Sequence, residues 1–337
     1  MRPLPVLRHD DFVYSRLKAL AWVTNGTGLP TLLQANAGRA VAHIIEHDEP
    51  TKPLVLDCKG IGEVDDHALE NARTLLQNQQ RPLVLLNAGA IDASIKRELG
   101  EYSLILIGGM PVYILGDDTI DRGIASRFIQ QAKEIVDAYV ATHVKECFQK
   151  YEGGRQRMAS TPLLASGVFD ARPLISDPLK FVWISLLMAD GLEDFLDRPL
   201  EQPQSADEAN KPTRHFRLLA VSLRGSPLAA AVGLLSGRHK TIEIVDHMGP
   251  KYKILEEPSL RSTAVEEDYI YVGDFVIGGT ELRIAQAYAR SKGSRIKHAV
   301  VIGRMLETAE YNLDFDITSL VNLHECSPNE RFVFLDY

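Results

Sequence analysis

A glycine-rich turn with polar side chains follows an apolar run in the last third of the chain. The run at residues 269–272, Tyr-Ile-Tyr-Val, is typical of a buried strand, and a helical pattern of apolar residues starts near Thr280. A strand, a glycine-rich turn such as Gly278-Gly279 and a helix, in this order, direct backbone N–H groups and the positive end of the helix dipole at an anion. Asp274 could accept hydrogen bonds from sugar hydroxyls, and Thr280 could cap the helix or donate to a phosphate oxygen. A tight turn that binds nothing has the same pattern.

A second turn of this kind is predicted about fifty residues earlier. Residues 216–221 read as a strand, 223–227 as the turn and 228–235 as an alanine-rich helix. Arg224 in this turn could form charge-assisted hydrogen bonds with phosphate oxygens. The sequence therefore predicts two anion-binding turns in one domain.

The later turn resembles the PRPP-binding motif of type I phosphoribosyltransferases, and the order of the two turns adds to the likeness. The residues that match the motif are Val272, Asp274, Phe275, Val276, Gly278, Gly279 and Thr280. The chain departs from the motif at Gly273, which stands where the first of two acidic residues is usual. The run before the glycines is also one residue short. The resemblance covers about residues 160–305, and the Ser166-Gly167 element resembles the N-terminal hood of orotate phosphoribosyltransferase.

The resemblance implies a parallel-sheet domain and a set of site residues. It places Asp274 at the ribose hydroxyls, as catalytic residue and magnesium ligand, and Ser166 and Gly167 near the base. The residues assigned to the 5′-phosphate are Gly278, Gly279 and Thr280, and those assigned to the pyrophosphate are Arg224, Gly225 and Ser226. Residues 246–261 stand where the family carries a mobile loop, from which Lys251 and Lys253 could reach a diphosphate. A solvated loop with incidental lysines is the other interpretation.

The first half of the chain shows a strand–helix rhythm of its own. Strands are predicted at 53–57, 82–87, 104–107 and 112–115, and helices at 65–79 and 92–99. This rhythm predicts a small α/β domain with a mainly parallel sheet. Residues 30–115 resemble STAS-like domains, which implies an interaction or regulatory module. Asp65-Asp66-His67 could be a metal or acid–base site, but helix-capping carboxylates beside a surface histidine explain the same residues.

A long helix is predicted between the two halves. Apolar residues return to one face from Asp118 to Lys150, and Gly153-Gly154 would end the helix. The predicted fold is therefore α/β with two domains: a STAS-like domain at 1–117, a linking helix at 118–154 and a phosphoribosyltransferase-like domain at 155–337.

Composition narrows the class of protein. The chain has 337 residues, 45% of them hydrophobic, and a formal net charge of −8, which argues against a general nucleic-acid binder. The three cysteines lack metal-ligand spacing and suggest a reducing cytoplasm. No uninterrupted apolar segment is long enough to span a membrane, and no apolar signal core starts the chain.

Three functions remain open on these observations. The first is a phosphoribosyltransferase that uses PRPP or a nucleoside monophosphate, a nitrogen base and Mg²⁺. The second is a catalytically degenerate sensor of PRPP or nucleotides, which Gly273 and the short run favour. The third is an effector subunit, for example of a bacterial conflict or phage-defence system, with a protein partner or a second copy bound through the STAS-like domain.

Overall fold

The computed structural model describes most of the chain in two compact units, Met1–Tyr139 and Val140–Tyr337. The described residues are 6–20, 22–23, 30–32, 52–65, 69, 82–99, 102–117, 119–157, 163–198, 216–236, 241–245, 267–305, 313–323 and 333–334. The boundary between the units falls inside one helix, and the domain limits predicted at 117 and 154 stay a prediction. No helix in these ranges has the length and hydrophobicity that crossing a bilayer requires.

The first unit is built on a six-stranded sheet with the order β1-β2-β5-β7-β9-β8. Its strands are β1 (Val6–Arg8), β2 (Val13–Arg16), β5 (Leu54–Asp57), β7 (Leu83–Leu86), β8 (Ser103–Ile107) and β9 (Met110–Leu115). Strands β2, β5 and β7 are parallel, and the other three pairings are antiparallel. The prediction of a mainly parallel sheet is therefore wrong, because β8 and β9 form a hairpin instead of crossing over.

The core of the first unit lies between this sheet and a short helix. Helix α3 (Asp92–Glu98) follows the 3₁₀ turn η2 (Gly89–Ile91) and buries Ile95 in the same core cluster as Leu54 and Leu85. The strand residues are buried along all of β5 and β7, as expected for strands covered on both faces. The remaining described elements are η1 (Leu17–Leu20) and a three-stranded sheet of β3 (Trp22–Val23), β4 (Pro30–Leu32) and β6 (Glu63–Val64).

The long helix between the two halves is shorter than predicted. Helix α4 spans Arg122–Glu146, and Phe148–Lys150 forms strand β10, which pairs with β13 (Gly167–Phe169). The apolar periodicity of residues 118–150 does not distinguish the last helical turn from a short strand. The prediction that the helix reaches Lys150 is therefore wrong.

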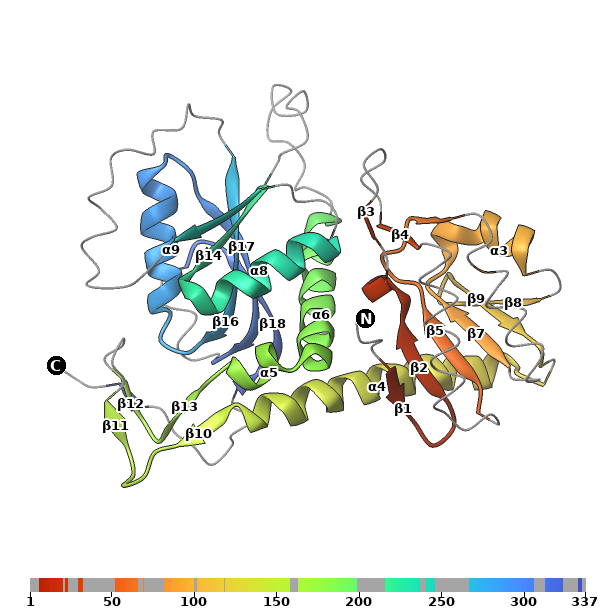
Figure 1. The fold of residues 1–337 in the computed structure, drawn as a ribbon, viewed down its shortest axis with the longest axis horizontal. Helices are drawn as coiled ribbons and strands as arrows, with labels where there is room; N and C mark the ends of the chain where they lie inside the picture. Colours follow the sequence, from red (N-terminus) through yellow and green to blue (C-terminus); the bar gives the residue numbers. More distant parts are fainter. Residues whose placement is uncertain are drawn as a thin grey trace. The chain divides into compact units, whose positions relative to one another are not determined.

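The second unit contains a five-stranded sheet with the order β15-β14-β16-β17-β18, in which every pairing is parallel (Figure 1). The strands are β14 (Phe216–Val221), β15 (Ile242–Val245), β16 (Asp268–Val276), β17 (Ile296–Arg304) and β18 (Asp316–Asn322). The parallel sheet predicted for this half is confirmed.

Helices cover both faces of this sheet. Alternate residues of β16 point to opposite sides: Ile270 and Val272 enter one core, and Tyr269 and Tyr271 enter the other. The first core packs α6 (Pro178–Leu196) and α8 (Ser222–Ser236) on the sheet, with the short helix α5 (Arg172–Ser176) beside them. The second core packs α9 (Thr280–Ser291). The result is a three-layer helix–sheet–helix arrangement.

A third sheet of the second unit joins residues from its beginning and its end. Strands β11 (Gln156–Arg157), β12 (Leu163–Ala165) and β19 (Val333–Phe334) pair antiparallel, with β19 at the edge. The C-terminal segment thus contributes a short edge strand to this sheet.

Candidate functional site

Two helices of the second unit begin at the same edge of the five-stranded sheet. Strands β14 and β16 are parallel neighbours, so their carboxyl ends lie at one edge. Helix α8 follows β14 and helix α9 follows β16. Open α/β sheets bind ligands at this edge, and helix N-termini there offer backbone N–H groups to anions.

The turn between β16 and α9 leaves the start of the helix open. Strand β16 continues to Val276, four residues beyond the predicted run, so the turn itself is residues 277–279. Gly279 is the N-cap residue, with φ 66° and ψ 12°, and no side chain of the described residues caps the helix. A side chain at this position would be strained by the left-handed backbone, although a Cβ there would meet nothing within 4 Å. Glycine at this position therefore follows from the backbone conformation, and no described residue fills the space where a Cβ would lie.

Asp274 lies within β16, two residues before the strand ends, and is half-buried. Its Oδ1 atom accepts a hydrogen bond of 2.7 Å from the backbone N–H of Phe275. Its negative charge helps to raise the pKa of Tyr271, so the carboxylate lies near that phenol. The predicted ribose-binding carboxylate is therefore placed beside the turn at the carboxyl edge.

Tyr271, which lies near Asp274, and Glu281, which lies near Tyr271, are two further polar residues at this edge. The hydroxyl of Tyr271 lies 3.4 Å from Oε2 of Glu281, in the first turn of α9. Burial raises the pKa of Tyr271 well above its usual value, and the charges of Glu281 and Asp274 raise it further. The phenol therefore stays protonated and acts as a hydrogen-bond donor.

Tyr271 also gives a physical reason for Gly273. A Cβ added at Gly273 would lie 2.5 Å from the Tyr271 hydroxyl and 2.6 Å from its ring. The two residues are i and i+2 on one strand and share a face, a signal that was readable in the sequence. The space in which a first acidic side chain would begin is filled by the phenol.

This packing gives a testable prediction. We expect Gly273→Ala to destabilise the second unit by roughly 1–3 kcal/mol, because the added methyl group overpacks the site. The same substitution in a Tyr271→Val background should cost clearly less, because the ring is absent. Urea unfolding of the four proteins of this double-mutant cycle measures the coupling. Equal costs of Gly273→Ala in both backgrounds would contradict the explanation.

The prediction of a turn at residues 223–227 is wrong. These residues lie in the first turns of α8, which begins at Ser222 directly after β14. Pro227 is inside the helix and donates no backbone hydrogen bond, a feature that reads as a turn signal in a sequence. The segment still lies at the carboxyl edge of the sheet, but it forms the N-terminal turns of a helix.

Gly225 shows how closely α8 approaches the central strand. A Cβ added at this residue would lie 3.4 Å from the carbonyl oxygen of Val272 and 3.4 Å from Cβ of Ala220. The beginning of α8 therefore lies against β14 and β16, and the structure brings Gly225 to the strand that carries Asp274.

The Ser166-Gly167 element is linked to the same strand through aromatic packing. The Phe169 ring lies 5.2 Å from the ring of Phe275, the residue that follows Asp274. Ser166 is buried, and its hydroxyl has no hydrogen-bond partner among the described residues. A Cβ on Gly167 would collide with the backbone oxygen of Gln149, so glycine is required there.

Several predicted site residues lie outside the described part of the chain. These are Lys251 and Lys253 of the loop at 246–261, Asp66 and His67 in the first unit, and the side chain of Arg224. Within the described residues, no cluster of three or more His, Cys, Asp or Glu side chains could hold a metal ion. Among these residues, Asp274 is therefore not part of such a cluster.

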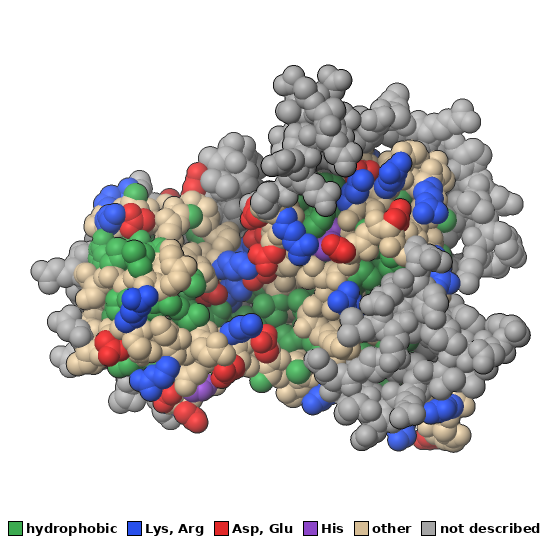
Figure 2. Space-filling model, turned by 180° about the vertical axis from the view of Figure 1, so that it is seen from behind, with side chains coloured by type: hydrophobic (Ala, Val, Ile, Leu, Met, Phe, Trp, Pro, Cys, Tyr) green, Lys and Arg blue, Asp and Glu red, His purple; other side chains and the backbone are tan. Residues whose placement is uncertain are grey.

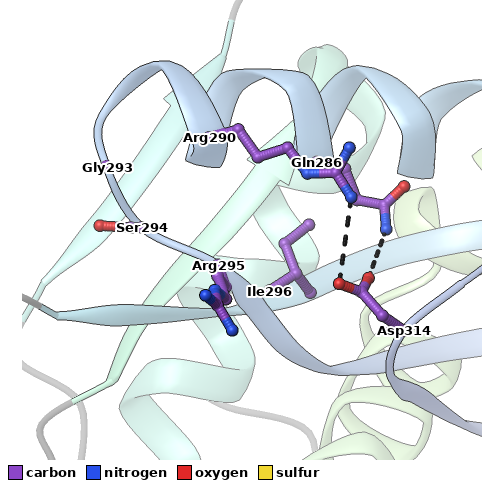
Figure 3. A pocket seen from close by; sticks show the side chains of 7 residues that line it. All are labelled: Gln286, Arg290, Gly293, Ser294, Arg295, Ile296 and Asp314. Carbon is purple, nitrogen blue, oxygen red and sulfur yellow. Dashed lines mark hydrogen bonds and ion pairs between the residues drawn. The ribbon is translucent and has the colours of Figure 1, made fainter.

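A cavity of about 420 Å³ lies at the other end of α9 (Figure 3). Its lining includes Arg290, Arg295 and Asp314, and Asp314 accepts a 2.9 Å hydrogen bond from Gln286. The cavity adjoins Ile296, where β17 begins, so it is at the amino edge of the sheet. A helix C-terminus disfavours anions, and we do not assign the site to this cavity.

The first unit carries a buried polar network at the carboxyl ends of its parallel strands, which sequence reasoning misses. Asp57 Oδ2 accepts a 2.7 Å hydrogen bond from Tyr14 and lies 3.3 Å from Nε of Arg16. Oδ1 accepts hydrogen bonds from the Asn87 side chain at 2.8 Å and the Lys59 backbone at 2.9 Å. A cavity of about 450 Å³, lined by residues 62–65, 90–91 and 93–94, lies at the segments that follow β5 and β7.

Comparisons with known proteins support a likeness in part of the chain. No family model and no curated protein matches the sequence. Solved structures similar to about half of the chain are phosphoribosyltransferases. The orotate phosphoribosyltransferase of Aeropyrum pernix is 18% identical, with a TM-score of 0.38 over 56% of this chain and 96% of that one. The adenine phosphoribosyltransferase of Thermoanaerobacter pseudethanolicus is 13% identical, with a TM-score of 0.38 over 54% of this chain and 98% of that one.

Because the TM-scores are low, we infer neither a ligand nor an activity from these similarities. The proposal below is based on the geometry of the carboxyl edge of the sheet. The STAS-like character of the first half stays a prediction.

Proposed function

We propose that the second unit binds PRPP or a nucleoside monophosphate and transfers a phosphoribosyl group to or from a nitrogen base. The observation that carries the proposal is the pair of helices, α8 and α9, that begin at one edge of the sheet with Asp274 between them in the chain. PRPP has two anionic groups on one ribose, and this edge offers two helix N-termini and one carboxylate. Each feature of the ligand would meet a feature of complementary charge or hydrogen bonding.

The 5′-phosphate would bind at the start of α9. Gly278, Gly279 and Thr280 form the end of the turn and the first helical position, where none of the described side chains caps the helix. Backbone N–H groups and the positive end of the helix dipole favour a dianion there. The Thr280 hydroxyl could donate one further hydrogen bond to a phosphate oxygen.

The ribose would lie across Asp274. An ionised carboxylate accepts hydrogen bonds from sugar hydroxyls, and its negative charge lies near the anomeric carbon as positive charge develops there. In the proposed reaction, a nitrogen atom of the base forms a bond to this carbon. The bond from the carbon to the pyrophosphate oxygen breaks, and its electron pair leaves with the pyrophosphate.

The pyrophosphate would be held by the start of α8. Gly225 allows close approach of the helix to the sheet, and Arg224 and Ser226 supply a guanidinium and a hydroxyl in the same segment. Lys251 and Lys253 would add positive charge from the loop at 246–261. Ser166 and Gly167 would face the base, since their strand segment contacts the end of β16 through Phe169.

Mg²⁺ fits this donor set in the way it usually binds to phosphate ligands. It commonly uses one or two protein carboxylates together with the oxygens of the substrate, so Asp274 and the diphosphate would hold it. When bound, the ion would neutralise charge on the pyrophosphate. The protein's own part is to orient the ribose and both anions for the reaction.

Calorimetric titration of PRPP in the presence of Mg²⁺ tests the proposal. We expect Asp274→Asn to weaken binding by roughly 1.5–3 kcal/mol, about 10- to 150-fold in Kd, because a charge-assisted hydrogen bond is lost. Asp268→Asn is the matched control: it makes the same change on the same strand, six residues away, where Asp268 contacts Arg295 and Lys297. That end of β16 is roughly 20 Å from Asp274, so Kd should not change.

One result would contradict the whole proposal, and another would contradict its catalytic part. Absence of PRPP and nucleoside monophosphate binding by the wild-type protein would contradict it as a whole. PRPP binding that depends on Asp274, without pyrophosphate release with any nitrogen base, would favour a sensor of PRPP or nucleotides. The observation that favours this second function is Gly273, which stands where the phosphoribosyltransferase motif has its first acidic residue.

A further inference from the structure

Strand β8 is an open edge of the six-stranded sheet in the first unit. Among the strands that the structure describes, β8 pairs only with β9. Its sequence, Ser-Leu-Ile-Leu-Ile, contains no charged residue and no proline. Edge strands in soluble proteins are usually protected by such residues, by bulges or by covering segments. An unprotected apolar edge is therefore a candidate for pairing with another strand.

The hairpin geometry shows which backbone groups point outward. Gly108 and Gly109 form a two-residue turn with φ 58° and 83°, and Ile107 pairs with Met110 across it. In such hairpins the closing pair exchanges hydrogen bonds, and bonded pairs then alternate along the ladder. Residues 103, 105 and 107 therefore bond to β9, and the N–H and C=O groups of Leu104 and Leu106 face the open edge.

Pro111 supports this alternation independently. It is the partner of Leu106 in the register, and proline has no N–H to donate. A residue without a donor fits a position that does not bond to β8. The backbone groups of this edge that pair with no described strand thus belong to Leu104 and Leu106.

The same two residues have exposed side chains. Leu104 is 47% exposed and Leu106 is 59% exposed, both on one face of the strand. Figure 2 shows hydrophobic side chains gathered on the surface of this unit, at the left of the view. Backbone and side-chain groups that are open to a partner therefore coincide at residues 104 and 106.

We propose that β8 pairs antiparallel with β8 of a second copy of this chain. The strand is symmetric about Ile105, with a leucine on each side, so a two-fold axis at Ile105 places Leu104 opposite Leu106 of the partner subunit in both directions. These two pairs use the outward backbone groups and bring exposed leucines together. Ile105 faces its own copy as the pair without backbone hydrogen bonds.

A second copy is favoured over an unrelated strand because the match is self-complementary. The pairing needs no partner of special sequence, and no two like charges come together. It would join two six-stranded sheets into one continuous sheet. A strand of a different protein would need to have the same apolar pattern, whereas a second copy of this chain always has it.

Sedimentation velocity of the full-length protein over a wide concentration range is the first test. We expect a reversible dimer, and Leu106→Lys should raise its dissociation constant roughly tenfold or more, since both symmetric leucine pairs are lost and two lysines enter the interface. Leu234→Lys is the matched control: it makes the same change at a leucine that is 72% exposed in the second unit. It should leave the dissociation constant unchanged. A dimer that is insensitive to Leu106→Lys would overturn the proposal.

Cysteine cross-linking tests the register. In a Cys326→Ser background, Ile105→Cys should form an intermolecular disulfide on mild oxidation, because the paired Cα atoms would be about 4.5 Å apart. Cys58 and Cys147 are buried and should not react. Ile107→Cys is the control: in this register the two copies of residue 107 are roughly 14 Å apart and cannot bridge. Absence of cross-linking at 105, or equal cross-linking at 107, would overturn the proposal even if the protein dimerises elsewhere.

Discussion

Asp57→Ala is expected to destabilise the first unit by about 3–5 kcal/mol, the usual cost of breaking a buried ion pair by removing one partner. Asp57 is 6% exposed and Arg16 is 4% exposed. The substitution leaves the guanidinium without this carboxylate and takes an acceptor from Tyr14, Asn87 and the Lys59 backbone. These groups come from β2, β5 and the residues that follow β5 and β7, so the loss loosens three adjacent strands together.

Each unit contains one tryptophan, so the unfolding of each unit can be followed separately by tryptophan fluorescence. In a Trp183→Phe background, fluorescence of Trp22 reports urea unfolding of the first unit in the full-length protein. Glu134→Ala is the control, because Glu134 is an exposed residue of α4 whose side chain contacts Gln130. It should change stability by less than about 0.5 kcal/mol. A loss below 1 kcal/mol for Asp57→Ala would mean that the network contributes little to stability.

The strands of both sheets are largely predictable because each is a short apolar run between turn residues. The predictions of β5, β7, β14 and β16 are confirmed, although β16 extends further than its apolar run. Whether a strand pairs parallel or antiparallel is harder to predict from the sequence, because a run such as Ser103–Ile107 has the same pattern in a hairpin and in a crossover. Only the close spacing of the two glycines after it indicates a hairpin.

The surroundings of the candidate site depend on contacts that a linear pattern does not contain. The start of α8 reads as a turn, since glycine, serine and proline are adjacent, yet strand β14 leads directly into the helix. Asp57 and Arg16 are separated by about forty residues, and only the parallel pairing of β2 and β5 places them side by side. The replacement of an acid by Gly273 is visible in the sequence, whereas the phenol that fills its place becomes clear only from packing.

A buried histidine should make the stability of the second unit depend on pH. His298 is fully buried on β17, stacks on Phe195 with ring centroids 4.0 Å apart, and contacts the Thr318 hydroxyl through Nε2 at 3.0 Å. Its Nδ1 atom has no hydrogen-bond partner among the described residues. The pKa of His298 is lowered to about 4, mainly by burial and then by the charge of Arg198, while Asp316 acts in the opposite direction. The neutral ring is therefore the form that the core accommodates.

Acid should destabilise the second unit through this residue. The folded pKa of about 4 is below the usual value of 6.5, so the unfolded chain binds the proton more tightly. Stability is then complete above pH 6.5 and is lost as the pH falls from 6.5 to about 4, by roughly 3 kcal/mol in total. Trp183 fluorescence in a Trp22→Phe background measures urea unfolding at each pH. His298→Gln removes the titrating group and keeps a donor for Thr318, so its stability should change less over this range. An equal acid loss in both proteins would show that other groups are responsible. His298 and Asp274 are carried by the same sheet. Ligand titrations should therefore be made above pH 7, where protonation of His298 does not change the stability of the second unit.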